Sequence, residues 1–302
     1  MLQSGNSVLC VDNLQTGSVA NIRHLIGHPD FRFLRQDILY LHTVSGPVDE
    51  ICNLACAASP RQYQKDPVHT LRTCTEGVLN LLELAERKGA RILQSSTSEV
   101  CGDPAVRLQN ENYRSCVNTV GPRACYYEGK RAAETLFWEY GAHRGVQTRI
   151  AHIFNTYGPR MNPQDGRVVS NFVVQALLGQ DLTVYGDGTQ TRSFCFVDDL
   201  VEGLVRLMAS DEQTPVNLGN PGEFTMLQLA ELVRAKVFAR TGGDVDLVFR
   251  PLSQYDPRQR RPDISLAARL LGWVPEVPLA DGLDRVVDWF ARRLAAPSHG
   301  FP

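Results

Sequence analysis

Two residues one helical turn apart, Tyr126 and Lys130 in Tyr-Tyr-Glu-Gly-Lys, have side chains that could move a proton. Positions i and i+4 share one face of a helix, so the Lys130 ammonium would lie beside the Tyr126 phenol. A neighbouring positive charge favours the ionised phenol, which can then act as a general base toward a hydroxyl group. Taken alone the spacing is weak evidence, because a tyrosine and a lysine on any helix surface would show it.

A run of hydroxyl groups precedes this pair in the sequence. The apolar residues that begin at Ile92 lead into Ser95-Ser-Thr97-Ser98-Glu99, which is typical of a buried strand that ends in polar side chains. Thr97 or Ser96 could then hydrogen-bond to the Tyr126 phenol. The two stretches together predict a site that deprotonates a sugar hydroxyl.

These stretches resemble the extended short-chain dehydrogenase/reductase family, which acts on nucleotide sugars, and within it the UDP-glucuronic acid decarboxylases. The resemblance covers essentially the whole chain. It implies an α/β fold, with a Rossmann-type doubly wound parallel sheet that binds NAD and a smaller C-terminal α/β domain that binds the nucleotide sugar. The expected domains are residues 1–160 and, mainly, 161–302, with a segment near 190–205 returning to the first domain.

The N-terminal third has acids and small residues at the ends of its expected strands. The strand that begins at Ser7 ends at Asp12, where an acid can bind the adenosine ribose hydroxyls, although an acidic turn after any strand looks the same. The strand 48–56 ends in small residues, which would let a dinucleotide approach the backbone. The resemblance implies that NAD contacts Asp12, Asn13, Thr16, Gly17, Asp37, Ile38, Leu54, Cys56, Thr73, Ser95, Tyr126, Lys130, Thr156 and Arg167.

Two amphipathic helices are expected, one from Leu71 to Lys88, ended by Gly89, and one from about Tyr126 to Arg144. The resemblance implies that they form a four-helix bundle across a homodimer. The pattern itself is explained at least as well by a core face within one chain.

The C-terminal half has polar loops between apolar runs, as binding loops often do. The resemblance assigns Asn155 and Arg167 to the sugar, Tyr185 to the uracil, and Arg192 and Arg260 to the diphosphate, which guanidinium groups bind in bidentate fashion. It also assigns Asn171 to the substrate.

Two further positions in this half are explained without a role in binding or catalysis. Asp198 and Asp199 begin a helix, where capping explains them, so neither is assigned to catalysis. Trp273 is expected in the core.

The resemblance also implies a reaction. Hydride passes from sugar C4 to NAD while Tyr126 takes the O4 proton, and Lys130 tunes the tyrosine and holds the nicotinamide ribose. The C4 ketone lies beta to the C5 carboxylate, so carbon dioxide leaves and an enolate results. Return of the hydride to C4 and of a proton to C5 gives UDP-xylose, which makes the enzyme a redox-neutral lyase. Thr97 assists Tyr126, Glu99 acts on protonation or orientation at C5, and Arg167 contacts the substrate near the reacting end.

Related activities differ at the strand end. A 4,6-dehydratase typically has Thr-Asp-Glu there, whereas Ser98 lacks the acid that would protonate the leaving hydroxyl. A 4-epimerase usually has no carboxylate at the position of Glu99. Both comparisons favour decarboxylation.

Two features depart from the family pattern. A first strand with a Gly-x-x-Gly-x-x-Gly turn, expected before Ser7 and central to the sheet, is not in the sequence, and Cys101 stands where tyrosine is usual. Either the sequence begins inside a longer gene product, or the chain is a variant with weak cofactor binding. A catalytically inactive homologue that serves as a dimerisation partner is therefore an alternative.

Composition narrows the remaining possibilities. The 302 residues carry a formal net charge of −2, which favours neither nucleic acid nor an anionic membrane as a partner. No apolar run reaches the ~18 residues of a membrane helix, and no metal-binding cysteine pair is present. Eight cysteines are expected to be reduced thiols in the cytoplasm, and a longer membrane-anchored form stays open.

Overall fold

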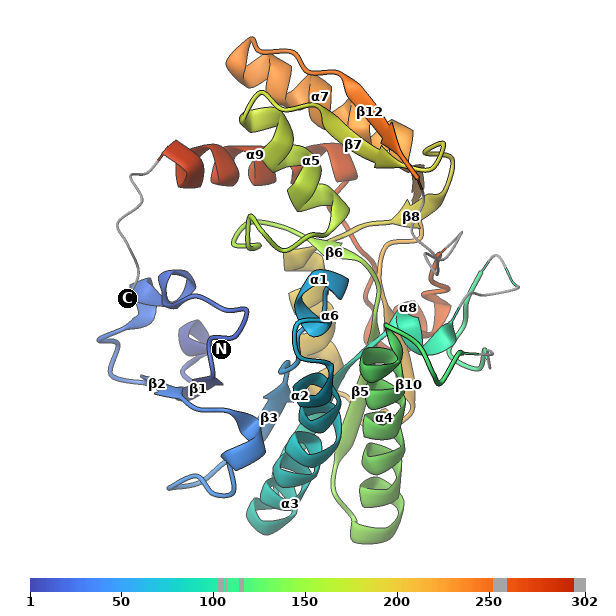
Figure 1. The fold of residues 1–302 in the computed structure, drawn as a ribbon. Helices are drawn as coiled ribbons and strands as arrows, with labels where there is room; N and C mark the ends of the chain where they lie inside the picture. Colours follow the sequence, from blue (N-terminus) through green and yellow to red (C-terminus); the bar gives the residue numbers. More distant parts are fainter. Residues whose placement is uncertain (103–105, 107, 114–116, 252–259, 296–302) are drawn as a thin grey trace. The chain divides into compact units, whose positions relative to one another are not determined.

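The computed structural model describes residues 1–102, 106, 108–113, 117–251 and 260–295, in which helices alternate with short strands (Figure 1). The chain forms two compact units. Unit 1 comprises residues 1–100, 118–151 and 211–215, and unit 2 comprises 101–117, 152–210 and 216–302. The domain border expected near residue 160 stays a prediction.

Two sheets hold the described strands of unit 1. β1 (Val8–Asp12) pairs with β2 (Phe31–Arg35), and β3 (Glu50–Asn53) pairs with β4 (Arg91–Thr97). The larger sheet has the order β10-β5-β4-β3, where β5 is Thr148–Ile153 and β10 is Pro215–Leu218. Among the residues that the structure describes, no strand lies between β1 and β3, the place expected for the first strand of a Rossmann sheet.

The first expected helix of unit 1 is continuous but changes its geometry. Its parts are α2 (Pro67–Arg72), the π-helical η5 (Thr73–Gly77) and α3 (Val78–Lys88). The Asp66 side chain caps α2 by accepting the His69 N–H at 2.9 Å. Gly89 ends α3 with φ 65°, as its position predicted.

The remaining helical segments of unit 1 are short except for the second expected helix, α4. They are α1 (Pro60–Tyr63), α4 (Ala124–Arg144), η1 (Leu2–Ser4), η2 (Val19–Asn21), η3 (Arg23–Leu25), η4 (Ile38–Tyr40) and η6 (Ser98–Cys101).

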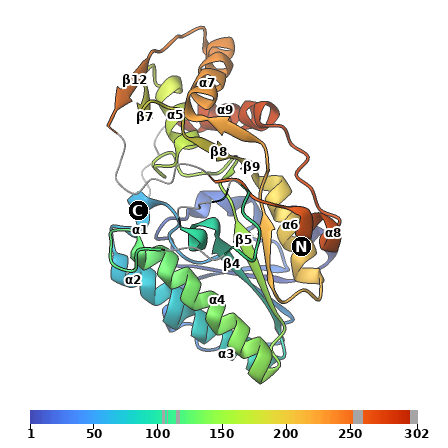
Figure 2. The same cartoon turned by 90° about the vertical axis from the view of Figure 1, so that its right-hand side faces the viewer.

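The core of unit 1 lies between the helices and the larger sheet. Leu82 of α3, Ile92 of β4 and Phe137 of α4 are fully buried there. Figure 2 shows α3 and α4 running side by side next to β4 and β5. The apolar stripes of both helices therefore serve the core of their own chain, as the pattern suggested.

Unit 2 contains three pairs of short strands. β6 (Thr156–Tyr157) pairs with β9 (Cys195–Phe196), and β7 (Leu182–Tyr185) pairs with β12 (Leu247–Arg250), both in parallel. β8 (Thr191–Ser193) pairs antiparallel with β11 (Glu223–Thr225).

The helices of unit 2 surround an apolar core. Their bounds are α5 (Val168–Leu177), α6 (Val197–Ala209), α7 (Met226–Thr241), α8 (Ser265–Leu271) and α9 (Leu279–Ala295). Thr225 and Gln228 form a capping box at the start of α7. Phe172 of α5, Leu229 of α7 and Val286 of α9 are buried in one apolar cluster.

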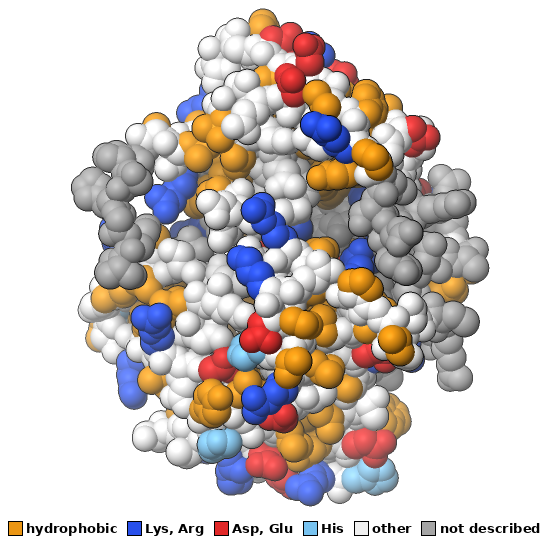
Figure 3. All heavy atoms as spheres, viewed as in Figure 1, with side chains coloured by type: hydrophobic (Ala, Val, Ile, Leu, Met, Phe, Trp, Pro, Cys, Tyr) orange, Lys and Arg blue, Asp and Glu red, His pale blue; other side chains and the backbone are white. Residues whose placement is uncertain are grey.

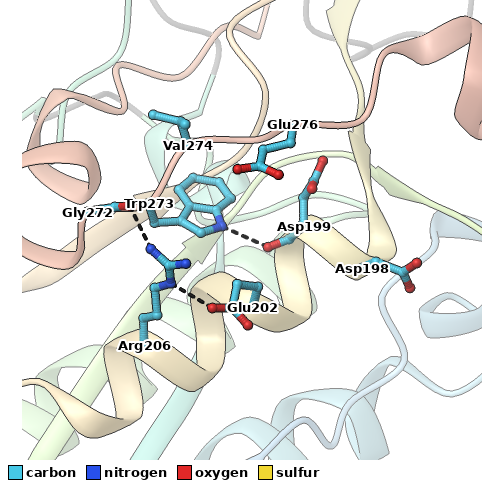
Figure 4. Close-up of a pocket in the computed structure, with 8 residues that line it drawn as sticks. All are labelled: Asp198, Asp199, Glu202, Arg206, Gly272, Trp273, Val274 and Glu276. Atoms are coloured by element: carbon cyan, nitrogen blue, oxygen red, sulfur yellow. Dashed lines mark hydrogen bonds and ion pairs between the residues drawn. The ribbon is translucent and has the colours of Figure 1, made fainter.

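The two acids at the start of α6 do not cap it, so the capping interpretation is wrong. Asp199 Oδ2 instead accepts the Val277 N–H at 2.9 Å, and Asp198 Oδ2 lies 3.5 Å from Arg285 Nη1. These carboxylates link α6 to the segment that leads into α9 and to α9 itself. Trp273 is buried, as expected, and its Nε1–H donates to the Asp199 carbonyl at 2.8 Å (Figure 4).

A polar cavity of about 300 Å³ borders this joint. In Figure 4, Arg206 reaches the Glu202 carboxylate on one side and the Gly272 carbonyl, at the end of α8, on the other. Residues that line the cavity connect α6 to the end of α8. None of the lining residues is a predicted site residue.

Candidate active site

Tyr126 and Thr97 meet within unit 1. Tyr126 lies in the first turn of α4 and is 5% exposed, and Thr97 is the last residue of β4. Their hydroxyl groups are hydrogen-bonded, and Thr97 Oγ1 also accepts the Glu99 N–H at 3.2 Å. Ser96 donates to the Glu134 carboxylate instead. Of the two predicted alternatives, Thr97 is therefore the partner of the phenol.

Lys130 is buried one turn after Tyr126, as the spacing predicted. Its ammonium donates to the Ser95 carbonyl at 2.6 Å, and Nζ lies 6.0 Å from the centroid of the Tyr126 ring. Burial, followed by the Glu99 carboxylate, raises the pKa of Tyr126 well above its usual range, whereas the Thr97 hydrogen bond lowers it. The expectation that the Lys130 ammonium favours the ionised phenol stays a prediction.

A second tyrosine, which the sequence analysis missed, fixes the plane of the Tyr126 ring. Tyr63 of α1 is fully buried and stacks on Tyr126 with a centroid separation of 5.0 Å and an interplanar angle of 3°. Stacked aromatic rings contribute about 0.5–1.5 kcal/mol beyond the area that they bury. The sequence gives no signal for this contact, because α1 is a single short turn.

Glu99 is held by an arginine that the sequence analysis also missed. Arg123 Nη2 donates to Glu99 Oε1 at 2.8 Å, and the two side chains are only 16% and 11% exposed. Arg123 precedes Tyr126 by three residues, at the N-cap of α4. In the sequence, only its position just before Tyr-x-x-x-Lys could have indicated that Arg123 belongs to the site.

Residues predicted to bind the adenosine part of NAD lie together at the end of β1. Asp12 Oδ1 accepts the Leu14 N–H at 2.6 Å, and Asn13 Nδ2 donates to Asp37 Oδ2 at 2.7 Å. A Cβ at Gly17 would lie 2.8 Å from Asp12 Oδ2, so only glycine allows the loop to stay against this carboxylate. Asp12, Asn13, Gly17 and Asp37 are therefore brought together, while the neighbouring Thr16 is exposed.

Asp37 joins the loops after β1 and β2 to α2. Burial would raise the pKa of its carboxyl, but hydrogen bonds from the Leu39 N–H, Asn13 and His69 prevail and lower it. We expect Asp37→Asn to reduce the free energy of unfolding by about 1 kcal/mol at pH 7, as for one net hydrogen bond. The folded-state pKa lies below the unfolded value of about 3.9, so the stabilisation is complete above that pH and is lost as the pH falls through the folded pKa.

Urea unfolding of Asp37→Asn and wild type at pH 7 and near pH 3 measures this effect. The difference in the free energy of unfolding should shrink at the lower pH. Asp30→Asn is the matched control, since Asp30 is exposed and makes one long contact, to Ser7 Oγ at 3.4 Å. A difference for Asp37→Asn that is the same at both pH values would contradict the assignment.

The other predicted NAD contacts of unit 1 differ in exposure and in their contacts. Leu54 is 59% exposed, whereas Ile38 is buried and packs where Gly77 leaves room. Cys56 has the unusual φ of 134°, and its Sγ lies 3.3 Å from Cys74 Sγ. Thr73 is the first residue of η5, and its hydroxyl donates to the His69 carbonyl at 2.8 Å.

The residues predicted to contact the reacting sugar lie in unit 2. Arg167, at the N-cap of α5, forms an ion pair with the buried Asp165, and its side chain is 42% exposed. Asn171 Nδ2 donates to the Gly166 carbonyl at 3.1 Å, so it shapes the same loop. Asn155 and Thr156 follow β5, and the Thr156 hydroxyl donates to the Phe154 carbonyl.

The predicted nucleotide residues are also in unit 2. Tyr185 ends β7 with half of its surface exposed, while Arg192 on β8 and Arg260 are more than nine-tenths buried. The Ser193 hydroxyl donates to the Arg260 carbonyl at 3.3 Å, which brings the two arginine-bearing segments together. Their assignment to the diphosphate stays a prediction.

The residues of unit 1 fit both ends of NAD. The loop at Gly17 is kept against Asp12 in a way that a Cβ would prevent, and the carboxylate suits a ribose diol. The buried Lys130 ammonium has three N–H donors, of which Ser95 takes one, so it can also bind the nicotinamide ribose.

The described residues contain neither a metal-binding cluster nor a membrane-spanning helix. No group of three His, Cys, Asp or Glu side chains could hold a metal ion there. No helix within this part of the chain has the length and apolarity needed to cross a membrane.

Known proteins match this chain over most of its length. Residues 1–219 match the profile of the NAD dependent epimerase/dehydratase family. UDP-glucuronic acid decarboxylase 6 of Arabidopsis thaliana is 52% identical over 297 residues, covering 98% of this chain and 85% of that protein. UDP-glucuronic acid decarboxylase 1 of Danio rerio is 51% identical, covering 97% of this chain and 69% of that protein.

Solved structures show the same fold. UDP-glucose 4-epimerase of Thermotoga maritima, solved with UDP-glucose, superposes with a TM-score of 0.86 at 27% identity, covering 97% of this chain and 93% of that chain. UDP-glucuronic acid 4-epimerase of Bacillus cereus, solved with UDP-glucuronic acid and NAD, gives 0.84 at 26% identity with the same coverage. The chain therefore belongs to the NAD dependent epimerase/dehydratase family and, within it, to the group of UDP-glucuronic acid decarboxylases.

Proposed function

We propose that this chain converts UDP-glucuronate to UDP-xylose and carbon dioxide, with NAD regenerated in each turnover. The observation that carries the proposal is the joint burial of Thr97, Tyr126 and Lys130 beside an ion-paired Glu99. Sequence identity of 52% and 51% to two UDP-glucuronic acid decarboxylases supports the choice of substrate. The proposed division of labour is NAD binding by residues 1–160 and nucleotide-sugar binding mainly by residues 161–302.

Tyr126 is the proposed base for the O4 hydroxyl of the sugar. NAD, when bound, accepts the hydride from C4 and later returns it. Because burial favours the neutral phenol, the Thr97 hydrogen bond matters: it lowers the pKa of Tyr126 and so supports the ionised form that accepts a proton. Lys130, held by the Ser95 carbonyl, would bind the nicotinamide ribose and add positive charge to the same region.

Glu99 is the proposed group at C5. Loss of carbon dioxide from the beta-keto acid leaves an enolate, and a proton must then reach C5. The Glu99 carboxylate has a fixed place, because the Arg123 guanidinium holds one oxygen and the backbone at Glu99 is tied to Thr97. It can therefore orient the sugar or a water molecule at C5. Arg167 is proposed to contact the substrate near this end, with Asn155, Asn171, Tyr185, Arg192 and Arg260 binding the rest of the UDP-sugar.

The test is turnover of UDP-glucuronate by the purified chain with saturating NAD, followed by proton NMR. Formation of UDP-xylose with equimolar carbon dioxide supports the proposal. An epimerase would give UDP-galacturonate without loss of carbon dioxide, and a dehydratase would lose water from a suitable UDP-hexose. A folded chain that produces none of these would favour the inactive dimerisation partner.

We also propose a homodimer through the continuous helix from α2 to α3 and through α4, on the face that includes α2 and α4. Leu71 Cδ1 lies 3.4 Å from the place of a Cβ at Gly129, so the helices pack closely. Val68, Leu71 and Trp138 are 67%, 41% and 56% exposed. Hydrophobic side chains lie among charged ones over these helices in Figure 3. A second copy that covers them would complete a four-helix bundle.

Light scattering during size-exclusion chromatography tests the dimer. We expect wild type to be a dimer and Trp138→Glu to be largely monomeric, because the dimer would bury the new carboxylate without a partner. Phe238→Glu on α7 is the control, as it replaces another aromatic side chain that is about half exposed. Equal behaviour of the two variants would count against this face.

The proposed location is the cytoplasm. Seven cysteines among the described residues are free thiols, which suits a reducing compartment.

A further inference from the structure

Arg123 and Glu99 form a nearly buried ion pair next to the proposed general base. Arg123 Nη2 lies 2.8 Å from Glu99 Oε1, and both side chains are mostly shielded from water. Burial raises the pKa of Tyr63, Tyr126 and Tyr127, and the negative charge of Glu99 raises it further. The charges of this ion pair are therefore poorly screened by water.

This arrangement matters for an anionic sugar. The proposed substrate carries its own carboxylate on C5, the carbon at which Glu99 is proposed to act. Two carboxylates a few ångströms apart repel each other strongly where water is excluded, and one of them would have to take up a proton or move away. A positive charge that is already bound to Glu99 reduces this repulsion.

We propose that Arg123 is a specificity-determining residue that lets Glu99 and the carboxylate of a uronate share one site. The inference rests on the proposed function, since it places the sugar carboxylate near Glu99. Arg123 acts through the charge of Glu99. It selects for a carboxylated sugar over the neutral hexose, which differs only at C6.

Binding of two UDP-sugars separates this role from a merely structural one. UDP-glucuronate and UDP-glucose are titrated calorimetrically into NAD-saturated protein that carries Tyr126→Phe, which prevents turnover. Adding Arg123→Gln should weaken UDP-glucuronate binding about 10- to 100-fold, as expected for an uncompensated charge pair in a partly screened site. UDP-glucose should change less than about 2-fold, since it has no carboxylate.

Two further variants sharpen the result. Arg123→Lys keeps the positive charge and should retain most of the preference for the uronate. Glu99→Gln combined with Arg123→Gln removes both charges of the pair, and it should restore much of the UDP-glucuronate affinity that Arg123→Gln alone loses.

The outcomes are distinct. Equal weakening of both ligands would assign Arg123 to folding of the site and overturn the proposal, as would no change for either. Wild-type protein that binds UDP-glucuronate selectively but does not decarboxylate it would refute the proposed function and leave the role of Arg123 in selectivity standing.

Discussion

Tyr126→Phe should lower kcat for UDP-xylose formation by about 10²- to 10⁴-fold, the range that positioned proton transfer usually contributes. The substitution removes only the hydroxyl that bonds to Thr97, and the ring stays stacked on Tyr63. Binding of NAD and UDP-glucuronate should therefore change little. Initial rates by NMR and binding by calorimetry measure the two effects separately.

Tyr127→Phe is the matched control for this prediction. Its hydroxyl donates to the Asn118 carbonyl at the surface, away from Thr97. The control should keep kcat within a few-fold of wild type. If both phenylalanine variants lose activity to the same extent, Tyr126 is not the base, and the ion-paired Glu99 becomes the next group to test.

Gly282→Ala should destabilise unit 2 by about 1–3 kcal/mol, the usual cost of overpacking a core. Gly282 lies inside α9, where alanine would otherwise stabilise the helix by about 1 kcal/mol. Here a Cβ would lie 2.0 Å from Tyr157 Oη and 2.8 Å from Phe196 Cδ2, and both aromatic rings are buried. Steric overlap should therefore outweigh the gain in helix propensity. The urea midpoint of unfolding, followed by circular dichroism, measures the change.

Two variants show whether close packing is the cause. Tyr157→Phe removes the nearest atom, so Gly282→Ala should cost less in that background, though some overlap with the ring persists. Gly243→Ala should be nearly neutral, because its nearest neighbour lies 3.5 Å away. A higher midpoint for Gly282→Ala than for wild type would show that the helix has room for the methyl group.

The chain of unit 1 could be predicted largely from local sequence patterns. The helices near 71–88 and 126–144, the strand that ends at Thr97 and the glycine that ends α3 all appear where period and capping residues placed them. The Tyr126–Lys130 spacing likewise gave both buried site residues, because i and i+4 fix the geometry within one helix.

Contacts between distant segments could not be predicted in this way. Tyr63 reaches Tyr126 from α1, which is too short to show a period. Arg123 pairs with Glu99, which lies 24 residues earlier in the chain. Asp199 bonds to the Val277 N–H across 78 residues, whereas helix capping was the nearest local explanation. The pKa of Tyr126 depends on burial and on Glu99, which only the packed structure reveals.

The π-helical stretch Thr73–Gly77 lets the two halves of one continuous helix present their side chains in different directions. A π turn holds an extra residue, and each residue advances a helix by about 100°. The side chains of α2 are therefore offset around the axis from those of α3. On one side of this offset His69 faces Asp37, and on the other Leu82 enters the core. Removing a single residue within 73–77 would leave both halves helical but would rotate one against the other. The contact of His69 with Asp37 and the burial of Leu82 could then not be kept at the same time.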